Sequence, residues 1–505
     1  MAVDLYLVDR FEGGSTMIER IDLPRALRWL WALAAAALPA AAFGQCEEAK
    51  LLPPSVEEGD LFGIAIAASG DTALFGAHGV FDRAGAVYVF NRQGRAWIEA
   101  GRILASDLRA NALFGHDVGI DGDLMVVGAP WDSDNGTLAG AAYAYRFDGR
   151  EWTDEFKLMA SDGGAFEFFA NRVAVSGDFV LIGESHDRDQ GPEAGAAYLY
   201  LTEGSTWTEY AKLLPSDGGE FDWFGFAVDI EGPVAVIGAR QDAPNGKESG
   251  SAYVYRFDGR EWVEEQKLLP SDGAAGDRFG NAVVVRGDTI VVGAPGRSEN
   301  GGASGAAYVF EFDGQRWTQT QKLLAFDGGR RHWFGVTTEL QGDTLLVGAF
   351  LENVAGGVYL FKHDGQRWVQ TGKLVSTDIS DGDQLGFGLA LAGDHALLGA
   401  HADDDAGAES GAAYVFDVSR GPCGGREKLR ARCTGDGQDN RIIAKIKKGL
   451  GQRTPTLRID EDPQTDSVVW LDCDGAGSTK LRGIASGTHR VELVGCRPSQ
   501  RVTCP

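Results

Sequence analysis

Residues 279 to 294 read Phe-Gly-Asn-Ala-Val-Val-Val-Arg-Gly-Asp-Thr-Ile-Val-Val-Gly-Ala. Small and β-branched residues on both sides of Gly287-Asp288 predict two strands joined by a two-residue turn, which is a tight hairpin. Farther along, the runs 305–312 and 316–324 flank the turn Asp313-Gly314 and predict two more strands. One sequence unit therefore contains four antiparallel strands.

The same unit recurs along the chain, because Phe224, Phe279 and Phe334 are 55 residues apart and each precedes a glycine. The Phe-Gly pairs and their degenerate copies begin at Phe62, Phe114, Phe169, Phe224, Phe279, Phe334 and Leu385. The second marker, Gly-Ala, begins at Gly76, Gly128, Gly183 (followed by Glu184 instead of alanine), Gly238, Gly293, Gly348 and Gly399. Seven four-stranded units at this period predict an all-β fold with a seven-bladed β-propeller over residues 45–423.

The two ends of the repeat array indicate how the ring closes. The fourth strand of a unit contains Lys-Leu, as at Lys267-Leu268, but the seventh unit lacks this strand, and Lys50-Leu51 precedes the first unit. We expect the N-terminal segment to supply the outer strand of blade seven. The same register brings Cys46 and Cys423 together and predicts a disulfide that locks the ring. A lipid-modified or free Cys46 is the alternative.

Residues 1–44 are typical of a signal peptide, with translation starting at Met17. Arginines precede the apolar run 29–42, and Ala42-Phe43-Gly44 is a small-x-small cleavage site. The apolar run is too short for a membrane span. We expect a secreted or cell-envelope protein, extracellular or periplasmic, with no transmembrane segment after signal removal.

Residues 424–505 are expected to form a small disulfide-containing, sandwich-like β domain. The runs 440–446, 467–471 and 489–494 are strand-like, and glycine-rich turns separate them. Four cysteines would stabilise a core too small to be robust alone, and their pairing is open among three possibilities: Cys433, Cys473, Cys496 and Cys504. Cysteine usage of this kind suits an oxidising compartment.

The net charge of −26 argues against a nucleic-acid partner, because an acidic protein repels phosphates. It favours cationic partners, divalent ions or simply solubility. The segment 424–505 is the exception, since it is net basic.

These motifs resemble the FG-GAP repeat family, known from the seven-bladed head of integrin α subunits and from bacterial secreted proteins. The resemblance rests on Phe-Gly, the hairpin, Gly128-Ala129-Pro130 and Gly-Ala-Ala-Tyr-Val-Phe at 305–310, and it extends over most of the chain. It implies extracellular binding or adhesion, although a fold does not fix a function.

Calcium-binding members of that family place an Asp-rich loop between the Phe-Gly and Gly-Ala strands. This chain has only two-residue turns there, such as Gly122-Asp123, and two residues cannot wrap a calcium ion. We therefore expect no cofactor, with calcium as the open alternative, and we expect the turn aspartates to bond local backbone amides.

In a four-stranded blade, the loop after the second strand and the linker between blades emerge on the same face. Aromatic and acidic side chains on this face predict a ligand site for an extracellular protein or glycan. The candidate residues are Trp131, Asp132, Asp134, Asp187, Asp189, Trp223, Trp333, Asp403, Asp404 and Asp405. The alternative is that the tryptophans wedge between blades and the aspartates cap turns.

The sequence thus predicts a non-catalytic extracellular binding or adhesion protein. It contains no nucleophile motif, metal-ligand spacing or phosphate-cradling loop that would point to an enzyme. Two alternatives stay open. One is a secreted carbohydrate-active propeller enzyme with carboxylates from several blades, and the other is a purely structural envelope protein.

Overall fold

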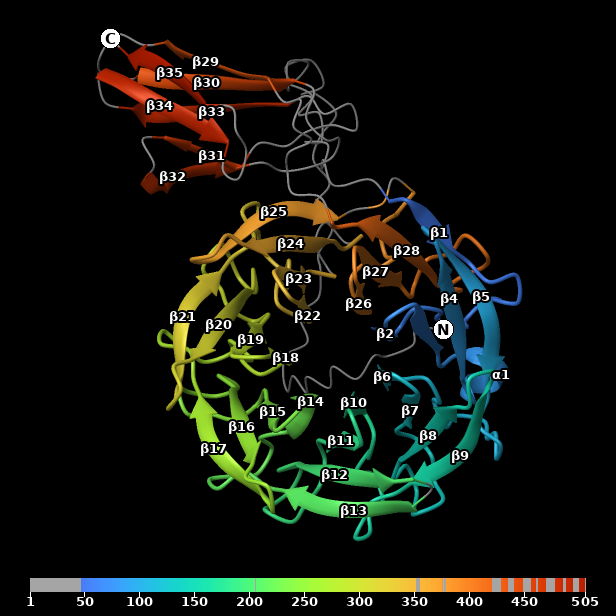
Figure 1. Ribbon diagram of the computed structural model, residues 1–505. Coiled ribbons are helices and arrows are strands. Elements are labelled where there is room, and N and C mark those ends of the chain that lie inside the picture. The colour runs from blue at the N-terminus through green and yellow to red at the C-terminus, as the bar shows by residue number, and fades with distance from the viewer. Residues whose placement is uncertain are drawn as a thin grey trace, which may run out of the picture. The chain divides into compact units, whose positions relative to one another are not determined.

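The computed structural model describes residues 47–419, except Ser205, 351–354, Val375 and Thr377, together with the backbone of seven later strands between Lys428 and Cys504. Residues 47–419 form seven four-stranded antiparallel sheets, arranged as blades around a central axis (Figure 1). The predicted all-β, seven-bladed propeller is therefore confirmed. One short helical segment, α1 (Val80–Arg83), occurs among the described residues.

The strands of each blade follow the chain from the axis outward (Figure 1). Blade 1 consists of β2 (Ile66–Ser69), β3 (Thr72–Ala77), β4 (Ala86–Gln93) and β5 (Ala96–Ile103), and blade 2 of β6 (Val118–Asp121), β7 (Leu124–Ala129), β8 (Ala141–Phe147) and β9 (Trp152–Leu158). Blade 3 consists of β10 (Arg172–Ser176), β11 (Phe179–Glu184), β12 (Ala196–Glu203) and β13 (Thr206–Leu213), and blade 4 of β14 (Phe224–Glu231), β15 (Val234–Ala239), β16 (Ser251–Phe257) and β17 (Trp262–Leu268). Blade 5 consists of β18 (Ala282–Arg286), β19 (Thr289–Ala294), β20 (Ala306–Phe312) and β21 (Trp317–Leu323), and blade 6 of β22 (Thr338–Gln341), β23 (Thr344–Gly348), β24 (Val358–His363) and β25 (Trp368–Leu374).

Blade 7 is built from both ends of the repeat array, as the position of Lys50-Leu51 predicts. Its strands β26 (Leu389–Ala392), β27 (His395–Ala400) and β28 (Ala412–Asp417) are followed at the outer edge by β1 (Ala49–Leu51). Lys50 pairs with Tyr414 in this sheet, and Lys267 pairs with Tyr253 in blade 4, so the register is the same. Cys46 and Cys423 lie outside the described residues, and the disulfide stays a prediction.

In most blades the first strand begins after Phe-Gly. The sequence instead predicts a first strand over 279–286 that includes Phe-Gly. In blade 5, β18 begins at Ala282, and Phe279 forms a parallel bridge to Gly250 of blade 4. The amide of Phe279 donates to the carbonyl of Ser249 (3.0 Å). The physical reason is the positive φ of Gly280 (87°), which turns the chain out of the extended conformation.

Glycine in the Gly-Ala marker allows neighbouring blades to touch through their backbones. A Cβ added to Gly293 of blade 5 would lie 1.9 Å from the carbonyl oxygen of Gly335 in blade 6. The same approach closes the ring, since a Cβ on Gly399 of blade 7 would lie 2.0 Å from the carbonyl oxygen of Gly63 in blade 1. Glycine at this position therefore permits the close approach of neighbouring backbones.

The phenylalanine of Phe-Gly fills the space between neighbouring sheets. Phe279 is fully buried and packs edge-on against Tyr308, with ring centroids 5.6 Å apart. It belongs to one hydrophobic cluster with Val236 and Val254 of blade 4. The repeated tryptophan of the outer strand also packs against the preceding blade, because Trp317 is buried and its Nε1 donates to Glu265 (3.1 Å).

The later strands form two antiparallel sheets. One contains β29 (Lys428–Thr434), β30 (Asn440–Lys447) and β33 (Gly477–Ile484), and the other contains β32 (Asp462–Val468), β31 (Thr456–Ile459), β34 (Gly487–Leu493) and β35 (Ser499–Cys504). The strand predicted over 467–471 falls only partly on β32. The expected signal peptide lies outside the described residues, and no helix in the part of the chain that the structure describes is long and apolar enough to cross a membrane.

Substitution of Gly293 by alanine tests the backbone contact between blades. We expect Gly293→Ala to lower the free energy of unfolding by about 3 kcal/mol, because the new methyl group overlaps the Gly335 carbonyl. Gly101→Ala is the control, since a Cβ there meets nothing within 4 Å. Chemical denaturation of both variants measures the effect, and equal stabilities would contradict the packing role.

Candidate functional site

The loops after the second strands and the linkers between blades form one face of the propeller, here called the loop face. In blade 3, Lys212 of the outer strand points into it. Its Nζ lies 2.8 Å from Asp162 of the preceding linker, and 2.7 Å from both Asp187 and Asp189 of the β11–β12 loop. The hydroxyl of Tyr198 also donates to Asp162 (2.8 Å). One ammonium group thus joins the linker, the loop and the outer strand.

The same lysine cluster recurs in other blades. In blade 2, Nζ of Lys157 lies 2.7 Å from Asp107, 2.8 Å from Asp132 and 2.6 Å from Asp134. In blade 7, Nζ of Lys50 lies 2.9 Å from Asp403 and also pairs with Asp405. Because Lys50 belongs to β1, closure of the ring also completes this cluster.

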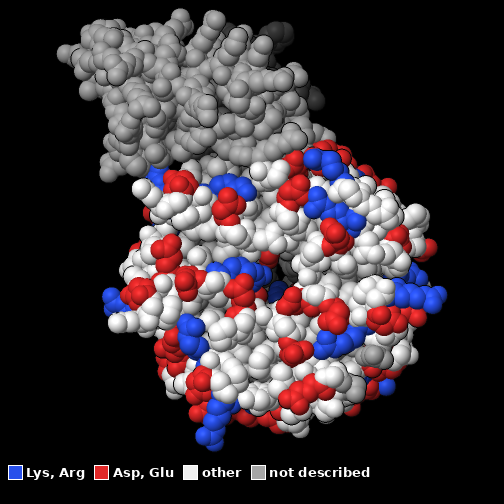
Figure 2. Space-filling view, viewed as in Figure 1, with Lys and Arg blue, Asp and Glu red and all other residues white. Residues whose placement is uncertain are grey.

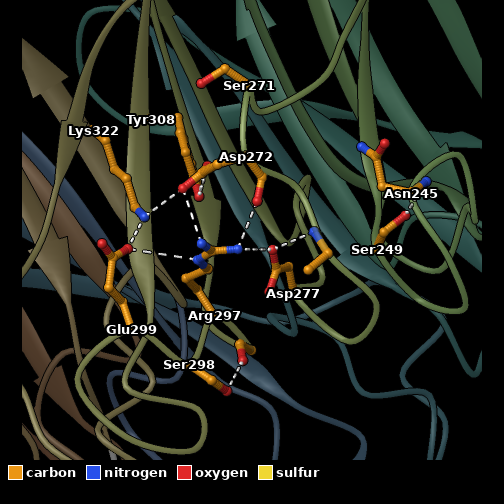
Figure 3. A network of polar contacts seen from close by, with 12 residues as sticks. Asn245, Ser249, Ser271, Asp272, Asp277, Arg297, Ser298, Glu299, Tyr308 and Lys322 are labelled. Carbon is orange, nitrogen blue, oxygen red and sulfur yellow. Dashed lines mark hydrogen bonds and ion pairs between the residues drawn. The ribbon is translucent and has the colours of Figure 1, made fainter.

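Blade 5 contains a variant of the cluster (Figure 3). Arg297 stands where blade 2 has Asp132, and its guanidinium lies 3.0 Å from Asp272 and 3.0 Å from Asp277. Lys322 lies 2.8 Å from Asp272 and also pairs with Glu299. A basic residue is therefore accepted at this position when additional carboxylates surround it.

The lysine clusters control the protonation of the linker aspartates. Burial alone would raise the pKa of Asp107, but hydrogen bonds from Lys157 and Tyr143 hold that pKa below its ordinary value. Lys212 and Tyr198 lower the pKa of Asp162 in the same way. These carboxylates therefore stay ionised in the folded protein at neutral pH.

The predicted ligand aspartates of the loop face have partners within the protein. Asp132, Asp187 and Asp403 are at most 3% exposed. One oxygen of each accepts the amide hydrogen two residues on, from Asp134 (2.9 Å), Asp189 (3.0 Å) and Asp405 (3.2 Å). Asp134, Asp189, Asp404 and Asp405 are exposed, and all of these except Asp404 pair with the lysine of their blade. The pairing supports the alternative that these aspartates cap turns and hold loops.

Blade 1 shows what replaces the cluster when it is absent. Arg102 stands at the lysine position, Ser55 at the linker aspartate and Val80 at the buried loop aspartate. The guanidinium of Arg102 lies over Phe81 and Tyr88 instead, 5.1 and 5.9 Å from the ring centroids. The lysine and two of the three carboxylates are thus lost together, while Asp82 stands at the position of Asp134.

The hairpin turns differ from expectation in that two of their aspartates pair with basic side chains. Asp123 pairs with Arg146 (2.9 Å), and Asp343 pairs with Lys362 (3.2 Å) in addition to a hydrogen bond from its own backbone amide. Both basic residues lie on the third strand of the same blade, which places them opposite the turn. In Figure 2, blue basic and red acidic side chains likewise lie next to one another around a central hollow.

The residue before each Phe-Gly has a left-handed backbone conformation in all seven blades. Its φ lies between 56° and 60°, a region that costs a non-glycine residue about 1 kcal/mol. Five residue types occupy this position in the seven blades: Leu61, Leu113, Phe168, Trp223, Arg278, Trp333 and Gln384. The repeat therefore fixes a backbone conformation here and leaves the side chain variable.

Two of these side chains, Trp223 and Trp333, belong to a collar of rings and cations at the axial end of the loop face, here called the axial rim. On one side, Phe350 lies 5.7 Å from Trp333 and 5.5 Å from Phe387, between ring centroids, and Phe387 lies 4.7 Å from His401. On the other side, the guanidinium of Arg240 lies 4.8 Å from the ring centroid of Trp223 and 4.0 Å from that of Phe226. The rim contains side chains of blades 4, 6 and 7 at positions where the repeat does not conserve one residue type.

Histidines complete the rim between blades 7 and 2. His78 and His116 stack with centroids 5.3 Å apart, and their Nδ1 atoms are 3.2 Å apart. His401 is 2% exposed, and burial followed by the charge of His78 lowers the pKa of His401 to about 3. It is therefore neutral at physiological pH.

The three predicted tryptophans have different surroundings, and all are partly exposed. Trp223 reaches the preceding blade, because its Nε1 donates to Glu193 (3.1 Å) and its ring lies 5.1 Å from that of His186. Trp333 belongs to the rim, whereas the backbone of Trp131 bonds the linker carbonyl of Ala112 (3.2 Å). Trp223 thus packs between blades, as the alternative interpretation of the tryptophans predicts. Trp223 and Trp333 both belong to the rim.

The four-stranded blades, the glycine contacts between them and the closure of blade 7 by the N-terminal strand β1 define a seven-bladed propeller with Phe-Gly and Gly-Ala repeats. A family model described as FG-GAP repeat matches residues 46–90, 97–145, 152–200, 207–255, 262–310, 317–361 and 368–416. These matches cover more than half of the chain, and the protein belongs to the FG-GAP repeat family. No curated protein matches the chain.

Substitution of Lys157 tests whether the lysine clusters hold the loop face together. We expect Lys157→Met to lower the free energy of unfolding by about 3 kcal/mol, because Asp132 then keeps a buried charge without its cation. Adding Asp107→Ser and Asp132→Val imitates blade 1 and should recover most of the loss. Denaturant titration measures all three proteins.

The control for this series is Lys247→Met, since the Lys247 side chain is 89% exposed. It should change stability by about 0.5 kcal/mol or less. If Lys157→Met were as mild as this control, the cluster would not stabilise the fold.

His401 predicts a loss of stability in acid. A histidine in the unfolded chain titrates near its ordinary pKa of about 6.5. Below that pH the unfolded chain binds a proton at His401, whereas the folded protein keeps His401 neutral. Stability therefore falls as the pH drops from 6.5 toward 3, by about 2 kcal/mol at pH 5 for this group.

His401→Phe should remove this share of the pH dependence, and blade 6 already has Phe350 at the matching position. Urea titrations at pH 7 and pH 5 give the comparison. An unchanged difference between the two pH values in the variant would show that His401 does not carry the effect.

Proposed function

We propose that this FG-GAP propeller is a non-catalytic extracellular binding protein that contacts its ligand through the axial rim. The observation that carries the proposal is the contrast between two kinds of position. Scaffold positions repeat in nearly every blade, whereas the position before Phe-Gly repeats its strained backbone but presents five residue types in seven blades. Backbone strain that recurs around a rim is typical of sites that present side chains to a ligand.

The chemistry of the rim favours a ligand with ring faces and negative charges. Trp223, Phe226 and Arg240 form a stack, and Nε of Arg240 has no hydrogen-bond partner. Burial, then the nearby charges of Arg278 and Arg172, lowers the pKa of Arg240 to about 9. A carboxylate or sulfate would relieve this repulsion, and sugar rings stack on aromatic side chains. An anionic glycan fits both features.

The pairing of the loop aspartates supports this assignment over recognition by the acidic loops. The buried loop aspartates form ion pairs with lysines of their own blades and thereby position the loops around the rim: Asp132, Asp187 and Asp403. The export signal expected at the N-terminus supports an extracellular or envelope location.

A glycan array with matched variants tests the proposal. The wild-type protein should bind uronic-acid or sulfated glycans, and Trp223→Ala and Arg240→Gln should each weaken binding about tenfold or more. Val263→Ala on the outer strand is the control, because Val263 is 47% exposed and remote from the rim residues in its blade. Binding unaffected by both rim variants would contradict the proposed site.

A further inference from the structure

Blade 3 departs from the other blades at the second residue of Gly-Ala. Here β11 ends in Glu184, which is 0% exposed. The other six blades have alanine at this position: Ala77, Ala129, Ala239, Ala294, Ala349 and Ala400. Packing of the repeat therefore requires only a methyl group, and the carboxylate of Glu184 is an addition specific to blade 3.

Glu184 lies beside two other buried carboxylates. One oxygen atom each of Glu167, Glu184 and Asp187 lies within 4.8 Å of the others, and the three residues are 8%, 0% and 3% exposed. They come from two segments, because Glu167 belongs to the linker before blade 3 and Asp187 to the β11–β12 loop. Three negative charges this close together repel one another strongly unless a cation or protons compensate them.

Neither oxygen of Glu184 accepts a hydrogen bond of ordinary geometry, and the Tyr198 hydroxyl is the one neighbouring group whose hydrogen bonding lowers the pKa of Glu184. The neighbouring donors are occupied, since Lys212 contacts Asp162, Asp187 and Asp189, and the single hydroxyl proton of Tyr198 goes to Asp162 (2.8 Å). Burial, and then the charges of Asp187 and Glu167, raises the pKa of Glu184 to about 8. A buried carboxylate without partners is costly, and this one faces two further acids.

Blade 2 provides the internal comparison. Its carboxylates Asp107, Asp132 and Asp134 also lie within 4.8 Å of one another, but the ammonium of Lys157 contacts all three. It has Ala112 and Ala129 where blade 3 has Glu167 and Glu184. Blade 3 thus keeps the lysine cluster and adds Glu184, whereas Glu167 stands where most blades have an aspartate and, like those aspartates, accepts a linker amide hydrogen, from Gly164.

We propose that Glu167, Glu184 and Asp187 form a buried site for a hard divalent cation, with calcium as the ion. Carboxylate oxygens are the ligands that such cations prefer, and calcium accepts ligands from flexible loops in irregular geometry. The ion would connect the linker to the β11–β12 loop. This position differs from the hairpin turns between first and second strands, which are too short to enclose an ion.

The experiment uses the full chain, stripped of metal with a chelator and titrated with Ca²⁺. We expect one ion per chain by calorimetry, a rise of a few degrees in Tm, and Tb³⁺ luminescence sensitised by nearby tyrosine such as Tyr198. Glu184→Ala restores the residue of the other blades. It should lower Ca²⁺ affinity at least about 100-fold and, in chelator, melt at a higher temperature than the wild type.

Two further variants make the result decisive. Glu203→Ala removes an exposed carboxylate of the same blade, and it should bind Ca²⁺ like the wild type. Glu184→Gln keeps the shape of a protonated glutamate and should lose Ca²⁺ binding. The proposal is overturned if the wild type binds no Ca²⁺, or if Glu184→Ala and Glu184→Gln bind it as tightly as the wild type does.

Discussion

The contact between glycine backbones of neighbouring blades is the constraint on which the rest of the structure depends. A Cβ on Gly293 or Gly399 would overlap the carbonyl of the next Phe-Gly. Only glycine fits there, and the contact fixes the distance between inner strands. Because the chain must then turn sharply into Phe-Gly, the preceding residue takes a left-handed conformation in every blade. The packing rule of the scaffold thus creates the positions at which the axial rim varies.

Lysine clusters form a second layer of organisation on the loop face. The net charge of −26 suggests a bare acidic surface, but many loop carboxylates contact an ammonium from their own blade. Each cluster joins segments far apart in sequence, which compensates for loops that contain little regular structure. The loop face therefore combines a stable, internally neutralised frame with an axial rim rich in aromatic and guanidinium groups.

Repetition made the fold predictable from the sequence. The number of blades follows from counting the Phe-Gly copies. Ring closure follows from finding Lys50-Leu51 before the first repeat and no such pair after the last one. Pairing of loop aspartates with lysines was not evident, because the partners are 23 to 50 residues apart and lie on different strands and linkers. One signal did exist: blade 1 lacks the lysine and two of its three carboxylate partners. Glu184 was visible in the same way, as the exception in a column of alanines, but its burial beside Glu167 needed the structure.

A double-mutant cycle between Lys50 and Asp403 tests this account most directly. The two residues are 353 positions apart in the sequence. They meet only if β1 completes blade 7 and the loop aspartate pairs with the lysine of its own blade. Stabilities of the wild type, Lys50→Met, Asp403→Asn and the double variant give the coupling. The account predicts a coupling free energy of about 2 kcal/mol. Additive effects of the two substitutions would contradict it.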